Sequence, residues 1–387
     1  MKVTRVETRV VNAGLRNWIF VRLETDQPGL IGWGEATLEW RTRGVLGAIE
    51  DLAPLIVGQD PCRTEFLWQS MYRAPFFREG AIGMSALSGI DQALHDIRAK
   101  DLGVPLFRLL GGHVRDRVRF YDHLGGGDQG SVYDPANVER FGELALRSVA
   151  DGFSAIKILA APPTAALDSA AAIRDVVGRI ERVRRAVGDD VDIMLDFHGR
   201  AWPAMAIAYG HAVTPYRPWF IEEPIPPDNV DALVEVARAL PIPIATGERL
   251  VTRHGFREVF ERRAVAIAQP DVCHAGGVTE IVKIAAMADT YNIALAPHNP
   301  LGPIATMVNL HLGFAIPNFL IQEVMRSDVP WRDDVVDAPI RFDGGYAALP
   351  TRAGIGVDLD EVEGAKHPFV QDHMHRVFQA DGAVADW

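Results

Sequence analysis

Three carboxylate residues each follow a short apolar run in the second half of the chain. Asp196 ends "DIMLD", Glu222 ends "PWFIE", and Glu248 follows "IPIATG". An oxygen ligand set without thiolates suits Mg²⁺, with Mn²⁺ as an alternative. The competing interpretation is three buried structural acids, but burying three like charges without a cation is costly. We therefore expect these side chains to form a divalent metal site.

A carboxylate and an imidazole follow the next two apolar runs. Asp271 comes after "AIAQP" and His298 comes after "IALAP". A carboxylate beside an imidazole orients the ring and raises its basicity, which is the arrangement of a general base. The alternative is that both are turn residues beside prolines. We expect His298 to be a base that is held by Asp271.

The segment "LDFHGR" places His198 two residues after Asp196. In a strand, residues two apart project from the same face, so both would point into the same mouth. That pairing suggests metal binding or proton transfer. The alternative is a carboxylate that caps the next helix beside an incidental histidine, and the segment alone does not separate the two.

The spacing of these residues predicts the elements that position them. Successive ionisable residues are 26, 26, 23, 27 and 25 positions apart. That period fits one strand, one helix and two loops, and parallel strands need such crossovers. The pattern predicts a (β/α) barrel, in which functional residues lie at the carboxyl ends of the strands. The residues counted are Asp196, Glu222, Glu248, Asp271, His298 and Glu323.

Strand alternation makes a further prediction about which side chains share a face. For four of these residues, the residue two positions earlier in the chain should also point into the barrel. The four inward-pointing residues are Met194, Phe220, Thr246 and Ala296. Glu223, next to Glu222, should point to the opposite side and have a structural role.

The first 115 residues show a different pattern, in which strands precede helices. "WIFVRLETDQPGLIGWGEATLEW" indicates two strands around a Pro-Gly turn, and "MSALSGIDQALHDIRAKDLG" has helical spacing of apolar residues. We expect Ser85 to cap that helix and Gly103 to end it. An α+β module over 1–115 is therefore predicted, followed by a barrel over 116–325 and a further segment over 326–387.

Composition limits the classes of partner. The chain has 387 residues and a net charge of −12, so its surface should repel polyanions and acidic lipids. We expect no nucleic-acid partner and no membrane partner, because the sequence has neither a long basic run nor an apolar run of membrane-spanning length. The start has no apolar signal-peptide core, so a cytoplasmic location is expected.

These motifs together resemble the mandelate racemase branch of the enolase superfamily. "LDFHGR", "FIEEP", "GER", "QPDVCHAGG" and "LAPHNPLGPIA" carry the likeness, with "LWQSMYRAPFFREG", "GIDQALHDI" and "AGIGVDLDE" outside the barrel. The resemblance runs nearly end to end. It implies an α+β capping domain, a modified (β/α)₇β barrel and a C-terminal segment that returns to the cap. It also implies a homo-oligomer.

The resemblance implies a reaction and a role for each residue. A sugar acid would lose its C2 proton to His298 and its C3 hydroxyl with help from His198 as general acid, giving a 2-keto-3-deoxy acid. Lys157 would neutralise charge on the enediolate oxygens. Glu323 would meet the substrate carboxylate, which requires Glu323 to be protonated or to share a proton. D-Galactonate is the first candidate substrate.

The sequence departs from the family pattern at two places near the strand ends. Leu159 stands where racemases of this branch carry a second lysine, so proton transfer from that position is excluded. Asp122 and His123 end the first barrel strand, where they would either bind sugar hydroxyls or, for Asp122, cap a turn. Both departures leave the reaction type intact and the identity of the sugar open.

In the cap, three residues are candidates for closing over the substrate, namely Arg16, Trp18 and Arg73. The alternative for them is ordinary packing and surface exposure. The rival functions are the same dehydration of another aldonate or aldarate, and racemisation or epimerisation of a 2-hydroxy acid. A non-enzymatic binding protein would be marked by a lost ligand or base, and none is lost.

Overall fold

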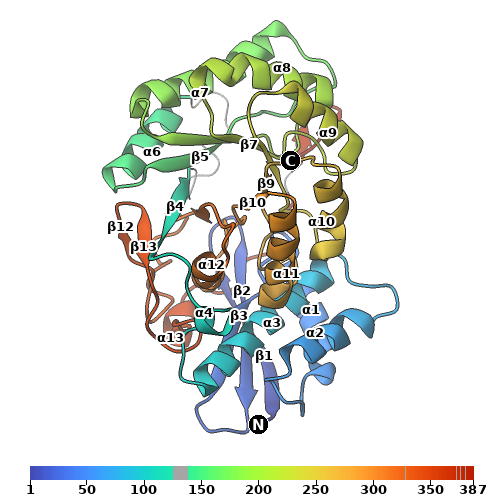
Figure 1. Ribbon diagram of the computed structural model, residues 1–387, viewed down its shortest axis with the longest axis vertical. Helices are drawn as coiled ribbons and strands as arrows, with labels where there is room; N and C mark the ends of the chain where they lie inside the picture. The colour runs from blue at the N-terminus through green and yellow to red at the C-terminus, as the bar shows by residue number, and fades with distance from the viewer. Residues whose placement is uncertain (125–137, 327, 372, 375, 380) are drawn as a thin grey trace.

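A small antiparallel sheet with helices lies at one end of the molecule, and a barrel of parallel strands lies at the other (Figure 1). The computed structural model describes residues 1–124, 138–326, 328–371, 373–374, 376–379 and 381–387. Within these residues, no helix is both long enough and apolar enough to cross a membrane.

The N-terminal part forms the predicted α+β module. Its antiparallel sheet has the order β1 (Val3–Asn12), β2 (Asn17–Thr25), β3 (Ile31–Glu35). The helical elements that follow are α1 (Thr42–Leu52), η1 (Ala53–Leu55), α2 (Thr64–Arg73), α3 (Ala81–Asp101) and α4 (Leu106–Leu109). Helix α3 lies very close to β3, since a Cβ on Gly34 would come within 2.1 Å of the Gly89 carbonyl oxygen. Glycine in β3 therefore allows the helix to pack on the strand.

The prediction for the start of α3 was wrong. Its N-cap is Gly80, and Ser85 lies inside the helix. The Ser85 hydroxyl donates to the carbonyl of Ala81 at 2.8 Å, the back-bonding that a mid-helix serine adopts. The predicted end is supported, because Gly103 follows the helix with φ +66° and its N–H donates to the carbonyl of Lys100.

The second part is the predicted (β/α)₇β barrel. Strand order in the parallel sheet follows the sequence from β4 to β10, and β11 pairs with β4. A parallel bridge between Leu295 of β10 and Phe319, just before β11, closes the sheet on itself. The strands are β4 (Arg117–His123), β5 (Ala155–Leu159), β6 (Asp192–Asp196), β7 (Phe220–Glu222), β8 (Ile244–Thr246), β9 (Ile267–Ala268), β10 (Ala294–Leu295) and β11 (Gln322–Val324). The helices are α6 (Val138–Ala150), α7 (Ala170–Val187), α8 (Pro203–Val213), α9 (Val230–Ala239), α10 (Thr252–Glu261), α11 (Gly277–Thr290) and α12 (Pro303–Ala315), with η3 (Thr214–Tyr216) after α8.

One side chain from each barrel strand or its edge fills the barrel interior. This inner cluster is Tyr121, Ala155, Met194, Phe220, Ala245, Ile267, Ala296 and Ile321. Three of the four inward-pointing residues that alternation predicts are present. The fourth prediction was wrong: β8 turns Ala245 inward, and Thr246 instead donates to Glu223. The cause is Gly247, whose φ of +149° breaks the alternation before Glu248.

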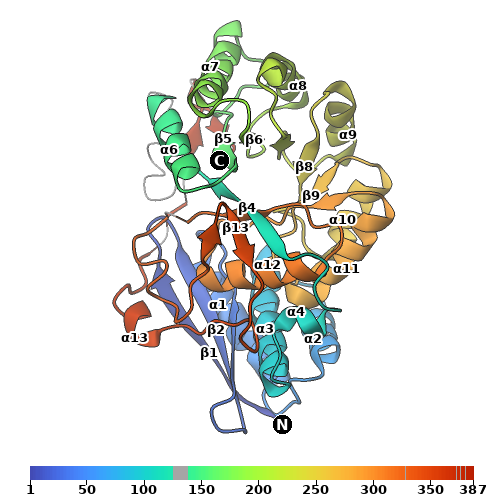
Figure 2. The ribbon, with the colours of Figure 1, turned by 60° about the vertical axis from the view of Figure 1, so that its left-hand side comes forward.

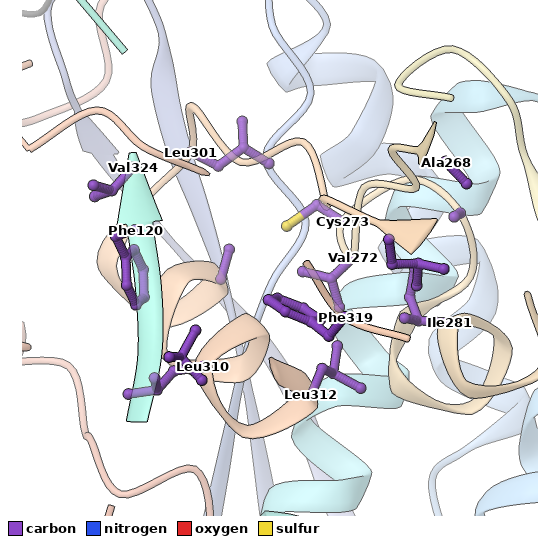
Figure 3. Packing of buried hydrophobic residues seen from close by; sticks show 14 of the residues in the cluster. Phe120, Ala268, Val272, Cys273, Ile281, Leu301, Leu310, Leu312, Phe319 and Val324 are labelled. Carbon is purple, nitrogen blue, oxygen red and sulfur yellow. The ribbon is translucent and has the colours of Figure 1, made fainter. Parts of the chain in front are cut away.

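The outward faces of the strands pack against the helices in the larger hydrophobic core. Figure 3 shows part of this layer, with Phe120 of β4 near Leu310 of α12. The barrel is therefore a closed scaffold with apolar layers inside and outside, and its polar residues are left for the strand ends.

The segment after β11 is bonded to both other parts. Strand β13 (Tyr346–Ala348) pairs antiparallel with β4, as Figure 2 shows, and with β12 (Phe342–Asp343). The Asn12 N–H of β1 donates to the carbonyl of His367, which lies after α13 (Glu361–Gly364). The chain then forms the small hairpin β14 (Val377–Phe378) and β15 (Val384–Ala385). The domain boundaries at 115 and 325 stay a prediction.

Candidate active site

A layer of mainly polar side chains lies directly above the apolar inner cluster. Residues two positions after the inner residues project into the same space, because side chains alternate along a strand. They are His123, Lys157, Asp196, Glu222, Gly247, Gln269, His298 and Glu323. On β8 this position is Gly247, and Glu248 follows it. The barrel therefore gathers its reactive groups at one end, as the spacing predicts.

The three carboxylates predicted to bind a metal lie together, in an arrangement that could hold an ion. Ligand oxygens of Asp196, Glu222 and Glu248 all lie within 4.8 Å of one another. Burial raises the pKa of Asp196 to about 6 and that of Glu222 to about 7, and neighbouring carboxylates add to both shifts. Burial, followed by repulsion from Glu223, raises the pKa of Glu248 well above its usual value. A divalent cation would offset this repulsion, so the donor set fits Mg²⁺.

Lys157 lies beside this cluster and pairs with one of its carboxylates, Glu222, and with Glu323. Its fully buried ammonium donates to both oxygens of Glu222, at 2.7 and 2.8 Å, and lies 2.7 Å from Oε1 of Glu323. Burial alone would lower the pKa of Lys157, but these two carboxylates raise it well above its usual value. The side chain of Gln269 also donates to Glu222, at 2.7 Å. Lys157 is therefore charged and holds Glu222 in place.

Glu323 lies among groups that favour its ionised form in this structure, and its role toward a substrate carboxylate stays a prediction. Burial would raise its pKa, but the Lys157 ammonium and His123 hold it well below its usual value. One carboxylate oxygen also accepts the Asn299 N–H at 2.7 Å. These partners all favour the charged form of Glu323.

The predicted base pair is formed. Nδ1 of His298 is 2.7 Å from Oδ2 of Asp271, whose other oxygen accepts the Cys273 N–H at 2.6 Å. Nε2 of His298 lies 3.4 Å from Oε2 of Glu248, on the metal-site side. Burial lowers the pKa of His298 well below its usual value and raises that of Asp271 well above. Burial therefore favours the neutral imidazole of His298, the form that a base needs.

His198 reaches the same site by a different route from the one predicted. Strand β6 ends at Asp196, so strand alternation does not place His198; its left-handed φ of +54° does. The His198 N–H donates to Oδ1 of Asp196 at 2.7 Å, and Nδ1–H donates to the Trp387 carbonyl. Burial lowers the pKa of His198 to about 3, so its Nε2 carries no proton at neutral pH in this structure.

His198, Glu248 and His298 of the barrel line a cavity of about 380 Å³, which is within the range of small-molecule sites. Glu39 and Ala81 from the cap also line it. The cavity therefore lies between the two parts of the chain, where a ligand would be enclosed by both.

Sequence reasoning missed several residues of this site, among them Gln269 and His274. Gln269 lies two residues before Asp271, and counting back along the strand would have found it. His274 lines the cavity, with Nε2 3.6 Å from Oδ2 of Asp271 and Nδ1 3.0 Å from the Ser85 hydroxyl. No spacing signal pointed to His274, because it lies in the loop after β9.

The residues of the first two barrel strands that differ from the family pattern do not all point the same way. Asp122 is buried, accepts from the Ser148 hydroxyl of α6 and lies 3.4 Å from Nε of Arg326. It therefore faces the helix layer in this structure. His123 points inward, with Nδ1 3.1 Å from Oε1 of Glu323. Leu159 is buried at the end of β5, opposite Asp196 of β6.

The cap candidates occupy three different environments. Arg16 is buried, donates to the Pro300 carbonyl at 2.7 Å and pairs with Glu39 at 2.5 Å. Trp18 has no exposed surface, so in this structure it packs in the core instead of facing a ligand. Arg73 ends α2 and donates to Gln69 at 2.6 Å on the surface. Neither Trp18 nor Arg73 is among the described residues that line the cavity.

Known proteins resemble this chain over its whole length. It is 43% identical to the D-galactonate dehydratase of Ralstonia nicotianae and 40% identical to that of Xanthomonas euvesicatoria, with both proteins covered in full. A mandelate racemase/muconate lactonizing enzyme-like protein from Roseovarius sp. TM1035 superposes with a TM-score of 0.91 at 34% identity, over all of both chains. An enolase from Agrobacterium radiobacter, proposed to be a galactarate dehydratase and solved with Na and L-malate bound, gives 0.89 at 31% identity, also in full.

The family patterns match both parts of the chain. The pattern described as mandelate racemase / muconate lactonizing enzyme, N-terminal domain, matches residues 3–111, and the enolase C-terminal domain-like pattern matches residues 140–363. These matches confirm the resemblance and the fold that it implied. The chain belongs to the mandelate racemase / muconate lactonizing enzyme family of the enolase superfamily.

Proposed function

We propose that the protein is a Mg²⁺-dependent acid-sugar dehydratase. It would remove the C2 proton and eliminate the C3 hydroxyl to give a 2-keto-3-deoxy sugar acid, with D-galactonate as the first candidate. The observation that carries this proposal is that one cavity is lined both by His298, which Asp271 contacts, and by Glu248 of the three-carboxylate cluster. The relatives named D-galactonate dehydratase support the choice of substrate.

Asp196, Glu222 and Glu248 would hold the metal ion. When bound, the ion would supply positive charge beside the substrate carboxylate, where proton removal from C2 builds negative charge. Lys157 would add a second positive charge beside the cluster, since it is already paired with Glu222. Mn²⁺ is the alternative metal for the same oxygen ligands.

His298 would take the C2 proton at Nε2. Its Nδ1 contacts Asp271, so only Nε2 is left to face the cavity. The carboxylate of Asp271 fixes the ring and stabilises the imidazolium that forms. Because Nε2 lies 3.4 Å from Glu248, a substrate held at the carboxylate cluster presents C2 to the base.

His198 would protonate the departing C3 hydroxyl. Hydroxide is a poor leaving group, and general acid catalysis typically contributes about 10²–10⁴ in rate. Since the pKa of His198 is about 3 without substrate, this role requires the pKa to rise when substrate binds. The His198→Asn variant tests the assignment: loss of dehydration with retained C2 deuterium exchange supports it, and equal loss of both contradicts it.

The competing reactions use the same base. An aldarate such as galactarate would place a second carboxylate in the cavity, and the Agrobacterium radiobacter structure favours this alternative. Racemisation or epimerisation would need a second base across from His298, and Leu159 cannot be that base, which leaves His198. A cytoplasmic location and a homo-oligomer stay predictions.

The test is a panel of aldonates and aldarates with purified protein and Mg²⁺, measured by formation of 2-keto acid. Each hit is repeated in EDTA. Turnover of D-galactonate that EDTA abolishes supports the proposal. Deuterium entry at C2 without loss of water would support the racemase alternative, and inactivity on every sugar acid despite bound Mg²⁺ would refute the dehydratase assignment.

A further inference from the structure

Two tryptophans from opposite ends of the sequence meet at the active-site cavity. Trp40 lies in the cap between β3 and α1, and Trp387 follows β15. Their ring centroids are 5.5 Å apart and the rings are nearly perpendicular, at 83°. Both residues line the cavity that also contains His198, Glu248 and His298. The cavity therefore has an aromatic wall that none of the roles assigned so far explains.

The indole of Trp387 is fixed by groups from the barrel. The guanidinium carbon of Arg200 lies 5.1 Å from its ring centroid, a cation–π contact. The ring of His198 is 5.9 Å away and perpendicular to it, at 88°. Because His198 is the proposed general acid, Trp387 lies next to the end of the cavity where the reaction would take place.

Trp40 is held in a strained backbone conformation. Its φ is +57°, in the left-handed region that a bulky residue rarely occupies. His198, which lines the same cavity, has φ +54°. Such conformations typically cost about 1–3 kcal/mol and persist at ligand sites. A glycine at position 40 would adopt this conformation without strain, so the indole is retained there despite a conformational cost.

We propose that Trp40 and Trp387 form the wall that contacts the carbon chain of the sugar acid beyond C3 and limits its length. This inference rests on the proposed function and deepens it. The carboxylate and the C2 and C3 groups would lie at the polar side, near Glu248, His298 and His198. The more distant carbons carry hydrogens as well as hydroxyls, and the flat indole faces give those hydrogens an apolar surface. Cavities that bind small molecules combine aromatic walls with a few polar groups in this way.

The test compares aldonates of five, six and seven carbons in four variants. Trp387→Ala and Trp40→Gly should change the ratio of kcat/KM between chain lengths by about tenfold or more, mainly through KM. Trp387→Phe keeps an aromatic ring and should stay near the wild-type ratio. Trp202→Phe, an exposed residue outside the cavity lining, is the matched control. An unchanged ratio in both Trp387→Ala and Trp40→Gly would overturn the inference and leave the dehydratase assignment intact.

A binding measurement separates the two proposals. In Mg²⁺-loaded His298→Asn, titration with D-galactonate or L-malate should change the tryptophan fluorescence, and adding Trp387→Phe should remove much of that change. This result would support the wall even if no sugar acid is turned over. No fluorescence change, or the same change with Trp387→Phe as with Trp202→Phe, would refute it. If Trp40→Gly fails to fold, the two Trp387 variants decide the question.

Discussion

Nδ1 of His298 lies 2.7 Å from Oδ2 of Asp271, although the two residues are 27 positions apart in the chain. The Cys273 N–H donates to the other carboxylate oxygen at 2.6 Å, which turns Oδ2 toward the imidazole. This arrangement fixes which ring nitrogen carries the proton. The reactive nitrogen of His298 is thus set by the loop after β9, one strand away from the histidine itself.

Replacing the base should stop proton abstraction without removing the metal. In His298→Asn, C2 deuterium exchange, followed by NMR in D₂O, should fall by about 10²–10⁴-fold or more. Mg²⁺ affinity, measured by calorimetry, should stay within a few-fold of wild type because His298 is not among the three carboxylate ligands. The control is His211→Asn, at an exposed position of α8. Retained exchange in His298→Asn would overturn the assignment of the base.

The pH dependence of catalysis follows from the lowered pKa of His298. Burial holds this pKa well below 6.5, so the imidazole stays unprotonated and competent as pH falls through 6.5. The acid limb of kcat/KM, which reports the free enzyme, should therefore lie below about pH 6.5. A profile measured from about pH 5 to about pH 8.5 checks this. An acid limb centred above 6.5 would contradict the burial argument.

Metal removal should make stability fall as pH rises. The pKa values of Asp196 and Glu222 are raised to about 6 and about 7, above their ordinary values. Raised carboxyl pKa values give stability that is present in acid and is lost as pH rises through 6 and 7. Urea denaturation in EDTA at about pH 5 and about pH 8 should show this loss.

Mg²⁺ should reverse that loss, because it binds the ionised carboxylates of the folded state. At about 100 times its Kd, a ligand adds about 2.7 kcal/mol to the free energy of unfolding. Glu248→Gln should lose most of this gain, and the exposed Glu235→Gln should keep it. Equal stabilisation of the two variants by Mg²⁺ would place the metal elsewhere.

Gly247 should be irreplaceable, because it allows Glu248 to reach the metal site. A Cβ at this position would lie 2.8 Å from the backbone carbon of Gln269, at a φ of +149°. Gly247→Ala should cost about 1–3 kcal/mol of stability and weaken Mg²⁺ binding. Gly178→Ala in α7, where a Cβ meets nothing within 4 Å, is the control and should be neutral or stabilising. Urea denaturation and Mg²⁺ calorimetry measure both effects, and normal Mg²⁺ affinity in Gly247→Ala would contradict this explanation.

The sequence period predicted the barrel and the gathering of the carboxylates correctly, because strand ends in a parallel barrel meet at one mouth. It failed where the backbone leaves the strand. Glu248 and His198 reach the site through left-handed turns, which a two-residue alternation does not describe. The carboxylate and the imidazole correctly indicated residues of the site, but strand alternation does not explain how they reach it.

Contacts between distant segments were harder to predict. The ion pair of Lys157 with Glu222 and Glu323 depends on which side chains share a layer, and that layer appears only once the strands are in register. Local sequence predicts that Ser85 caps a helix, yet Ser85 contacts His274 of the barrel, 189 positions away. No local pattern reports such a pair.

The place where the chain passes the cavity has a practical consequence for handling the protein. Residue 387 lies against Trp40 and His198, whereas residue 1 is at the far end of the cap (Figure 1). An affinity tag fused after Trp387 would begin at the cavity wall and would lower the measured activity. Purification handles, fluorophores and surface-immobilisation linkers therefore belong on the amino-terminal side.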